Sequence, residues 1–272
     1  MNECACGCGG RNVSRAALII TDIFLVCCFP IYTKFTALAA LADKVQFEAA
    51  AGNEAAQQVI VDHLKTLVGS HANDPWLLLI AAQVLWSAGQ TKEALQCVSS
   101  SHAAASTHLE LMITALQIYL KLDRLDLARQ QLQAMKQADE DGILTQLASV
   151  YVSLALGTTG AADAVHLLNA LSEQYGYSVY LLNLTACALM QQGDYAAAEQ
   201  KLDECLREYQ ASPEVPPLPD TYINAICCSV QQSKSPVTFL QQLQQLFPRH
   251  AYCAGWERVV AAFDREAVKY KV

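Results

Sequence analysis

The stretch YLKLDRLDLARQQLQAM, residues 119–135, holds two helical segments separated by the short charged run LDRLD. Leu, Ala, Gln and Lys favour helix on both sides of that run. Similar interruptions return in WSAGQTKEALQCV (86–98), TTGAADAVHLLNAL (158–171) and MQQGDYAAAEQKL (190–202). Each consists of a polar turn, then an alanine within a second amphipathic helix. The sequence therefore predicts that LDRLD is the turn inside one helical hairpin of a repeating series.

The spacing of the repeats is nearly constant. The shared alanines of the second helices are 34, 36 and 34 residues apart, at Ala94, Ala128, Ala164 and Ala198. A helix–turn–helix period of 34 residues is typical of tetratricopeptide repeats, in which small residues let the paired helices pack closely. The first helices carry large, small and large residues at matching positions: Leu78, Ala82, Leu85; Leu144, Ala148, Tyr151; and Leu182, Ala186, Leu189. The set Met112, Leu116 and Tyr119 departs by having leucine at the small position, and the repeat at 144 has extra residues before its turn.

Composition supports an all-α fold. Hydrophobic residues make up 53% of the 272 residues, and no proline occurs between Pro75 and Pro213. Proline breaks helix interiors, so this gap permits many consecutive helices. The formal net charge of −8 argues against a nucleic-acid partner and against a basic membrane-facing surface.

We predict an all-α, tetratricopeptide-like α-solenoid of stacked helical hairpins over residues 33–272, preceded by an atypical, partly apolar segment at 1–32. Its expected parts are a divergent first pair (33–70), four repeats (73–209), a proline-rich connector (210–219), a divergent pair (220–248) and a capping helix (249–272). Asn73 or Asp74 should cap the helix that begins at Pro75, and Ser235 should cap the helix whose first turn contains Pro236. The last helix places Tyr252, Trp256, Val259, Phe263 and Tyr270 on one stripe. That stripe either covers the end of the solenoid or binds a partner.

Stacked hairpins expose the concave side of their first helices, which commonly holds an extended or protruding peptide. The repeat register predicts that this face is lined by Trp76, Leu79, Gln83, Trp86, Ile113, Gln117, Leu120, Asn183, Cys187 and Met190. The set is apolar with a few amides, and it suits a partner that brings backbone and apolar side chains. Alternatively, some of these side chains pack between neighbouring repeats.

The sequence gives little support for catalysis, and neither a cofactor nor a metal is expected. The six histidines lack HExxH spacing, no phosphate-binding glycine loop occurs, and the run DED (139–141) is placed to complement a helix dipole. The 11 cysteines include CACGC (4–8), whose alternate spacing differs from that of a zinc site. Most of the others lie on predicted helices and resemble buried, reduced thiols of a cytosolic protein.

Three segments carry a more specific resemblance: LKLDRLDLARQQLQAM, DEDGILTQLASVYVSLALG and LLNLTACALMQQGDYAAAEQKLDECL. They resemble the epsilon subunit of coatomer, the COPI vesicle coat, and the similarity runs from about residue 35 to the end. PDTYINAI and FDREAVKY resemble family segments too. The resemblance implies a non-catalytic subunit whose curved solenoid clasps the C-terminal region of the alpha coatomer subunit. It further implies a cytoplasmic protein, peripheral on Golgi membranes and COPI vesicles, that serves retrograde Golgi-to-endoplasmic-reticulum and intra-Golgi traffic. Membrane contact would be only indirect, through the coat.

The N-terminus departs from that family, because epsilon subunits carry further repeats where this chain has residues 1–32. The run from Ala16 to Phe29 follows Arg11 and Arg15, as in a secretory signal, yet it contains Asp22 and is shorter than a bilayer span. It is a signal or anchor, a short buried helix, or the product of an incorrect or alternative first exon. Two other functions stay open: a tetratricopeptide adaptor or co-chaperone for another peptide, and a secreted or membrane-tethered repeat protein. A co-chaperone would need Lys or Arg on the concave face to neutralise a peptide carboxylate, and the predicted lining has none.

Overall fold

The computed structural model describes residues 35–50, 53–71, 74–99, 108–211 and 217–270. The predictions for residues 1–32 lie outside these ranges. All regular elements within the ranges are helical, which confirms the all-α prediction. The chain divides into two compact units at residues 167 and 168, inside helix α9 (Ala161–Tyr175).

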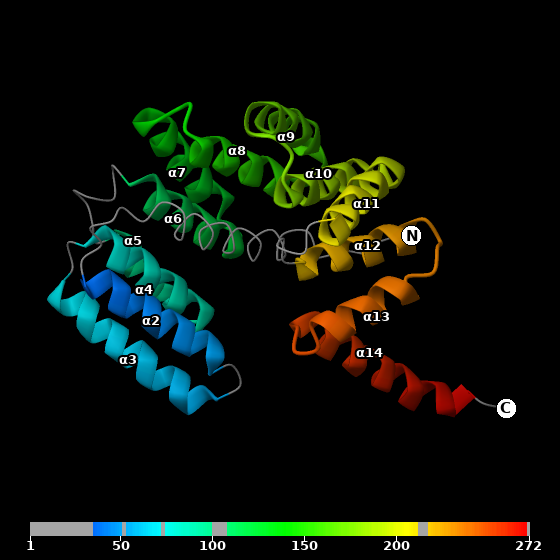
Figure 1. Ribbon diagram of the computed structural model, residues 1–272, viewed down its shortest axis with the longest axis horizontal. Helices are drawn as coiled ribbons and strands as arrows, with labels where there is room; N and C mark the ends of the chain where they lie inside the picture. The colour runs from blue at the N-terminus through cyan, green and yellow to red at the C-terminus, as the bar shows by residue number, and fades with distance from the viewer. Residues whose placement is uncertain (1–34, 51–52, 72–73, 100–107, 212–216, 271–272) are drawn as a thin grey trace. The chain divides into compact units, whose positions relative to one another are not determined.

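The first unit is a series of antiparallel helical hairpins (Figure 1). Its elements are α2 (Phe35–Ala49), α3 (Glu54–Ser70), α4 (Pro75–Ser87), α5 (Thr91–Ser99), α6 (Leu109–Lys121), α7 (Leu125–Ala138), α8 (Ile143–Ala155) and the 3-10 turn η1 (Gly157–Thr159). The first helices α2, α4, α6 and α8 contact one another in that order, while α5 packs on α4 and α7 on α6. The prediction that LDRLD joins two helices is confirmed, because α6 ends at Lys121 and α7 begins at Leu125.

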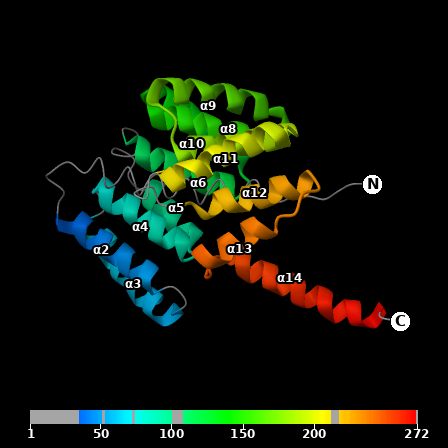
Figure 2. The ribbon, with the colours of Figure 1, turned by 45° about the vertical axis from the view of Figure 1, so that its right-hand side comes forward.

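The second unit continues the same plan. It contains α10 (Val179–Gln192), α11 (Tyr195–Ala211), α12 (Pro219–Gln231), α13 (Val237–Leu246), α14 (Ala251–Ala267) and the 3-10 turn η2 (Val268–Tyr270). Helices α10 and α11 form one hairpin and α12 and α13 another, and α12 also packs against α10 and α11. Helix α14 follows α13 and continues away from it, as both views show (Figures 1 and 2).

Burial separates the two kinds of helix. Every residue of α4 from Leu77 to Trp86 is buried, whereas α5 buries only Ala94, Cys97 and Val98. The four alanines that defined the period are each 0% exposed: Ala94, Ala128, Ala164 and Ala198. Because an alanine has no side chain beyond Cβ, these positions allow the second helix of each hairpin to approach the first closely. The contacts of α5 with α4, of α7 with α6 and of α11 with α10 confirm this packing role for Ala94, Ala128 and Ala198.

Four hairpin turns close in the same way. The residue after the turn donates its backbone N–H to a carbonyl five residues earlier: Gln90 to Leu85 (2.8 Å), Arg124 to Tyr119 (2.9 Å), Asp194 to Leu189 (3.0 Å) and Lys234 to Ser229 (2.8 Å). Such bonds close a Schellman motif, which needs one residue in the left-handed conformation. That residue is Gly89 (φ 79°), Asp123 (φ 59°), Gly193 (φ 83°) and Ser233 (φ 57°) respectively. The same backbone conformation therefore recurs at these four hairpin turns.

The turn after α8 is different. The extra residues predicted there form η1, with Gly157 in the left-handed region at φ 67°. Gly160 then lies so close to the carbonyl of Ser153 that a Cβ atom would collide with it. This repeat therefore needs glycine at two positions, for conformation at one and for space at the other.

Caps fix where several helices begin. Asp74 caps α4 by accepting the N–H of Trp76 over 3.3 Å, and Pro75 occupies the first turn. The expected cap at position 73 or 74 is thus Asp74. The prediction for Ser235 is wrong by one residue, because Pro236 occupies the N-cap of α13 and makes no side-chain cap bond. Proline has no backbone N–H, so no helical hydrogen bond is lost when proline occupies the N-cap position.

Candidate protein-interaction surfaces

The ten residues predicted to line a concave face lie at two depths. Six are buried: Leu79, Gln83 and Trp86 on α4, Ile113 and Gln117 on α6, and Asn183 on α10. The other four are half-buried: Trp76, Leu120, Cys187 and Met190. Of the ten, only these four residues are partly exposed. Trp76, on α4, packs against the core of the first unit, and Met190, on α10, packs against a core cluster of the second.

Two of the buried residues are held by lysines that the repeat register did not single out. The Lys44 ammonium, on α2, donates to the side-chain carbonyl of Gln83 over 3.0 Å. Lys44 is only 8% exposed, and its removal from water lowers the pKa of its amine. Lys121, on α6, places its ammonium 4.7 Å from the centre of the Trp86 ring. Neighbouring first helices therefore contact each other through these predicted lining positions.

The same arrangement occurs in the second unit. Asn224, on α12, donates its side-chain N–H to Asn183 Oδ1 over 2.9 Å, and the same nitrogen lies 3.2 Å from the sulfur of Cys187. Asn183, Cys187 and Asn224 thus form a polar contact between two first helices. For Gln83, Trp86 and Asn183, contacts between neighbouring repeats are enough to explain the position of the side chain, and no partner protein is needed to explain it.

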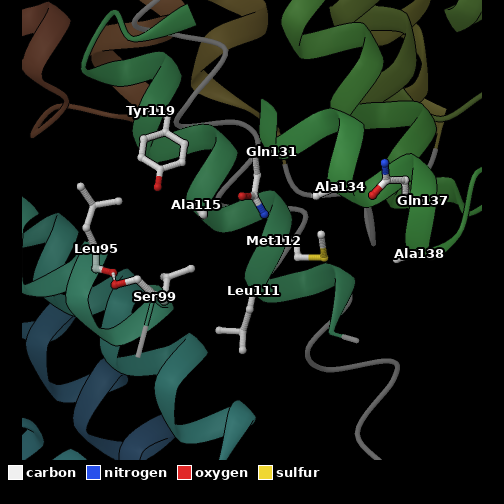
Figure 3. A pocket seen from close by; sticks show the side chains of 11 residues that line it. Leu95, Ser99, Leu111, Met112, Ala115, Tyr119, Gln131, Ala134, Gln137 and Ala138 are labelled. Atoms are coloured by element: carbon white, nitrogen blue, oxygen red, sulfur yellow. Dashed lines mark hydrogen bonds between the residues drawn. The ribbon is translucent and has the colours of Figure 1, made fainter. Parts of the chain in front are cut away.

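A hollow that the sequence did not predict lies in the first unit. It measures about 500 Å³ and is built by α5, α6 and α7 (Figure 3). Short side chains leave the space, because Ala115, Ala134 and Ala138 stand where larger residues would fill it. Its remaining lining residues are Leu95, Val98, Ser99, Leu111, Met112, Tyr119, Gln131 and Gln137. The hollow therefore has apolar walls with amide and hydroxyl groups among them.

The third surface is the stripe on α14. Its first turn is anchored, since Tyr252 and Cys253 pack with Tyr222, Leu243 and Phe247. Beyond that turn the stripe is exposed: Trp256 is 37% exposed, Val259 65% and Phe263 71%. In the part of the chain that the structure describes, this stripe covers no neighbouring apolar face. Of the two roles left open for it, the exposure favours contact with a partner.

Cys97, Cys187 and Cys205, which lie on helices, are not activated thiols. Removal of the thiol from water raises the pKa of Cys97 to about 11 and that of both Cys187 and Cys205 to about 12. A thiol must lose its proton to act as a nucleophile or metal ligand, and these three keep theirs at neutral pH. Among the described residues, no three His, Cys, Asp or Glu side chains gather as metal ligands. No helix within the described ranges is long and apolar enough to cross a bilayer.

Comparison with known families explains the repeat array. The sequence model of the coatomer epsilon subunit family matches residues 16–271. The chain belongs to the coatomer epsilon family. It is 28% identical to "Coatomer subunit epsilon" of Caenorhabditis elegans over 243 residues, which are 88% of this chain and 78% of that protein. It is 31% identical to "Coatomer subunit epsilon-2" of Oryza sativa subsp. indica over 216 residues, which are 79% of this chain and 69% of the other.

Coverage of the plant relatives is partial. "Coatomer subunit epsilon-1" of Arabidopsis thaliana is 33% identical over 178 residues, and the match takes in 65% of this chain. The matched part spans 57% of the length of that relative.

Solved structures confirm the tetratricopeptide-like solenoid fold. A tetratricopeptide repeat protein from Parabacteroides merdae superposes with a TM-score of 0.66 at 13% identity, covering 91% of this chain and 96% of that one. PilF of Pseudomonas aeruginosa gives a TM-score of 0.51 at 14% identity, covering 83% of this chain and 99% of that one. At such identities the likeness concerns the fold alone. The chain therefore shares its repeat fold with these two proteins.

Proposed function

We propose that this chain is a non-catalytic structural subunit of the COPI coatomer. In this role it binds and stabilises the C-terminal region of the alpha coatomer subunit. It would act in the cytoplasm, peripheral on Golgi membranes and COPI vesicles, in retrograde Golgi-to-endoplasmic-reticulum and intra-Golgi transport. The observation that carries the proposal is the family match over residues 16–271, together with the helical hairpins of the described residues.

The half-buried residues of the candidate face support a site for the alpha subunit on that face. Of the ten candidate lining residues, the half-buried ones are the available contacts, with Leu120 on α6 in the first unit and Met190 on α10 in the second. Both are apolar, and methionine is favoured at interfaces. The buried Gln83, Trp86 and Asn183 would act indirectly, by fixing the distance between neighbouring first helices.

The test is co-expression of the full chain with the C-terminal region of the alpha coatomer subunit from the same organism, followed by gel filtration. Stoichiometric co-elution is the expected result. Leu120→Glu and Met190→Glu should each weaken the complex at least about tenfold, since a carboxylate would be placed against an apolar surface. Val59→Glu is the matched control, because Val59 is 70% exposed on α3 and lies outside the candidate face.

Two results would contradict the proposal. A folded chain that ignores the alpha subunit would refute it directly. Binding of a peptide with a free C-terminal carboxylate, competing with the alpha subunit, would favour the adaptor alternative instead. Circular dichroism of each variant separates a lost contact from a lost fold.

A further inference from the structure

Beyond its first turn, α14 carries an apolar surface that the rest of its unit leaves exposed. Trp256, Val259 and Phe263 are spaced three and four residues apart, so they lie on one face of the helix. Val260 is also 40% exposed beside them. A contiguous exposed apolar face on a soluble helix indicates an interaction site. From here on, the name α14 stripe is used for the exposed residues Trp256, Val259, Val260 and Phe263, a smaller set than the stripe predicted from the sequence.

A hollow runs along one edge of the α14 stripe. It measures about 330 Å³ and lies between α13 and α14, where it is lined by Gln244, Trp256, Glu257, Val260, Ala261 and Asp264. Trp256, Val260 and Ala261 give it apolar surface, while Gln244 of α13 contributes an amide. Glu257 and Asp264 add two carboxylates. Neither carboxylate forms an ion pair with any residue that the structure describes.

The positive charges of α14 do not neutralise this edge. Arg258 and Arg265 each follow a stripe residue by two positions, which places them on the opposite side of the helix. Lys269 is engaged with Glu266, 2.7 Å from one carboxylate oxygen and 2.9 Å from the other. The border of the stripe at Glu257 and Asp264 is therefore acidic.

This charge pattern selects among the surfaces that an apolar stripe could contact. An anionic membrane would be repelled by Glu257 and Asp264, since helices that lie on membranes carry Lys and Arg on their polar face. A second copy of this chain would bring the same acidic edge and a net charge of −8. A protein helix with an apolar face bordered by Lys or Arg complements both the stripe and the edge.

We propose that the α14 stripe and its acidic edge form a docking site for a basic amphipathic helix of a partner protein. An arginine of that helix would enter the hollow, stack on the Trp256 ring and pair with Glu257 or Asp264. Apolar side chains one turn away would cover Val259 and Phe263. This site is separate from the lining positions assigned to the alpha subunit, and it stands whether or not that assignment holds.

The test uses two synthetic helical peptides with identical leucine faces, one bordered by Arg and Lys and the other by Glu. Binding to the full chain is measured by fluorescence anisotropy at low and moderate salt. The basic peptide should bind at least about tenfold more tightly than the acidic one, and the difference should shrink as salt is added. Phe263→Ser should weaken binding of the basic peptide at least about tenfold, since the substitution removes the apolar contact. Val59→Ser, at an exposed position of α3, should leave it unchanged.

The decisive variant is the double charge reversal Glu257→Lys with Asp264→Lys, which should make the chain prefer the acidic peptide. All substituted residues are exposed, so the fold should survive and circular dichroism should be unchanged. Equal binding of the two peptides, or a preference that survives the reversal, would overturn the proposal. So would a dimer in sedimentation that Phe263→Ser abolishes, or binding to phosphatidylserine vesicles that depends on Phe263.

Discussion

The ammonium of Lys44 and the side-chain carbonyl of Gln83 meet 3.0 Å apart inside the first unit and join helix α2 to helix α4. Both residues are buried, and the amide nitrogen of Gln83 has no hydrogen-bond partner among the described residues. The contact therefore places a charged group and an incompletely bonded amide between two helices. Pairs of this kind are costly to break but are replaceable as a unit.

Replacing the two partners together should cost less than the single changes imply. Gln83→Met leaves the buried ammonium without this acceptor and should lower the free energy of unfolding by about 2–3 kcal/mol. Lys44→Met removes the charge and should cost about 1 kcal/mol. The double variant should be more stable than Gln83→Met alone, as measured by urea unfolding. Strictly additive effects would contradict this coupling.

The left-handed turn residues should respond in opposite directions to glycine and alanine. Asp123 sits at φ 59° in the LDRLD turn, so Asp123→Gly should raise stability by about 0.5 kcal/mol. Gly193 is at φ 83°, where alanine is strained, so Gly193→Ala should lower the free energy of unfolding by about 1 kcal/mol. Gly69 near the end of α3 has open space around it and an ordinary φ, so Gly69→Ala should stabilise instead. Thermal unfolding of the three variants checks the signs.

Helix α11 offers a test of close hairpin packing. Ala198 is 0% exposed, and Ala198→Leu would force extra volume against α10 and α12, at an expected cost of about 1–3 kcal/mol. Ala196 is exposed two residues earlier in the same helix, so Ala196→Leu should change stability by less than about 0.5 kcal/mol. Equal effects at both positions would mean that the repeating alanine is not a packing requirement.

Stability should fall in alkaline solution because of the buried thiols. The pKa of Cys205 is raised from 9.0 to about 12, so above pH 9 the unfolded chain loses this proton while the folded chain keeps it. The stabilisation that comes from the protonated Cys205 thiol is fully present below pH 9. It is lost as the pH rises towards 12, and the free energy of unfolding falls by about 1.4 kcal/mol per pH unit for one thiol.

Cys205→Ala should therefore be less stable than the parent chain at pH 7, because a buried side chain is shortened. Its stability should fall less steeply between pH 9 and pH 11. Parallel stability curves for the two proteins would contradict the assignment. Urea unfolding at a series of pH values, with a reductant present, provides the comparison.

The repeat array was predictable because its signals are local. Gly89 and Gly193 mark turns by residue type, and the alanines mark the helix contacts that follow. Asp123 and Ser233 adopt the same backbone conformation without glycine. The turn at Asp123 was located by its place in the repeat series, and the one at Ser233 by the serine and proline that follow it.

The tertiary environment was harder to predict. Lysine is rarely buried, so no pattern indicated that Lys44 would lie against Gln83. Helical spacing identified the stripe on α14 but carried no information on what covers it. The hollow beside α6 arises because alanines of two different helices line the same space. A pattern of residues along one helix does not predict which residues of another helix will face it.

The Schellman closures in four of the turns bear on how the chain folds. Each bend is set by bonds spanning five residues, so a hairpin can form before its neighbours are in place. Chains dominated by such short-range contacts fold quickly, and arrays of repeats can nucleate at any member and grow outward. Opening should likewise be graded along the array, beginning at hairpins with the fewest neighbours. The hairpins at one end of such an array can open and bind a partner while the central hairpins stay folded and protected from proteases and from amide hydrogen exchange.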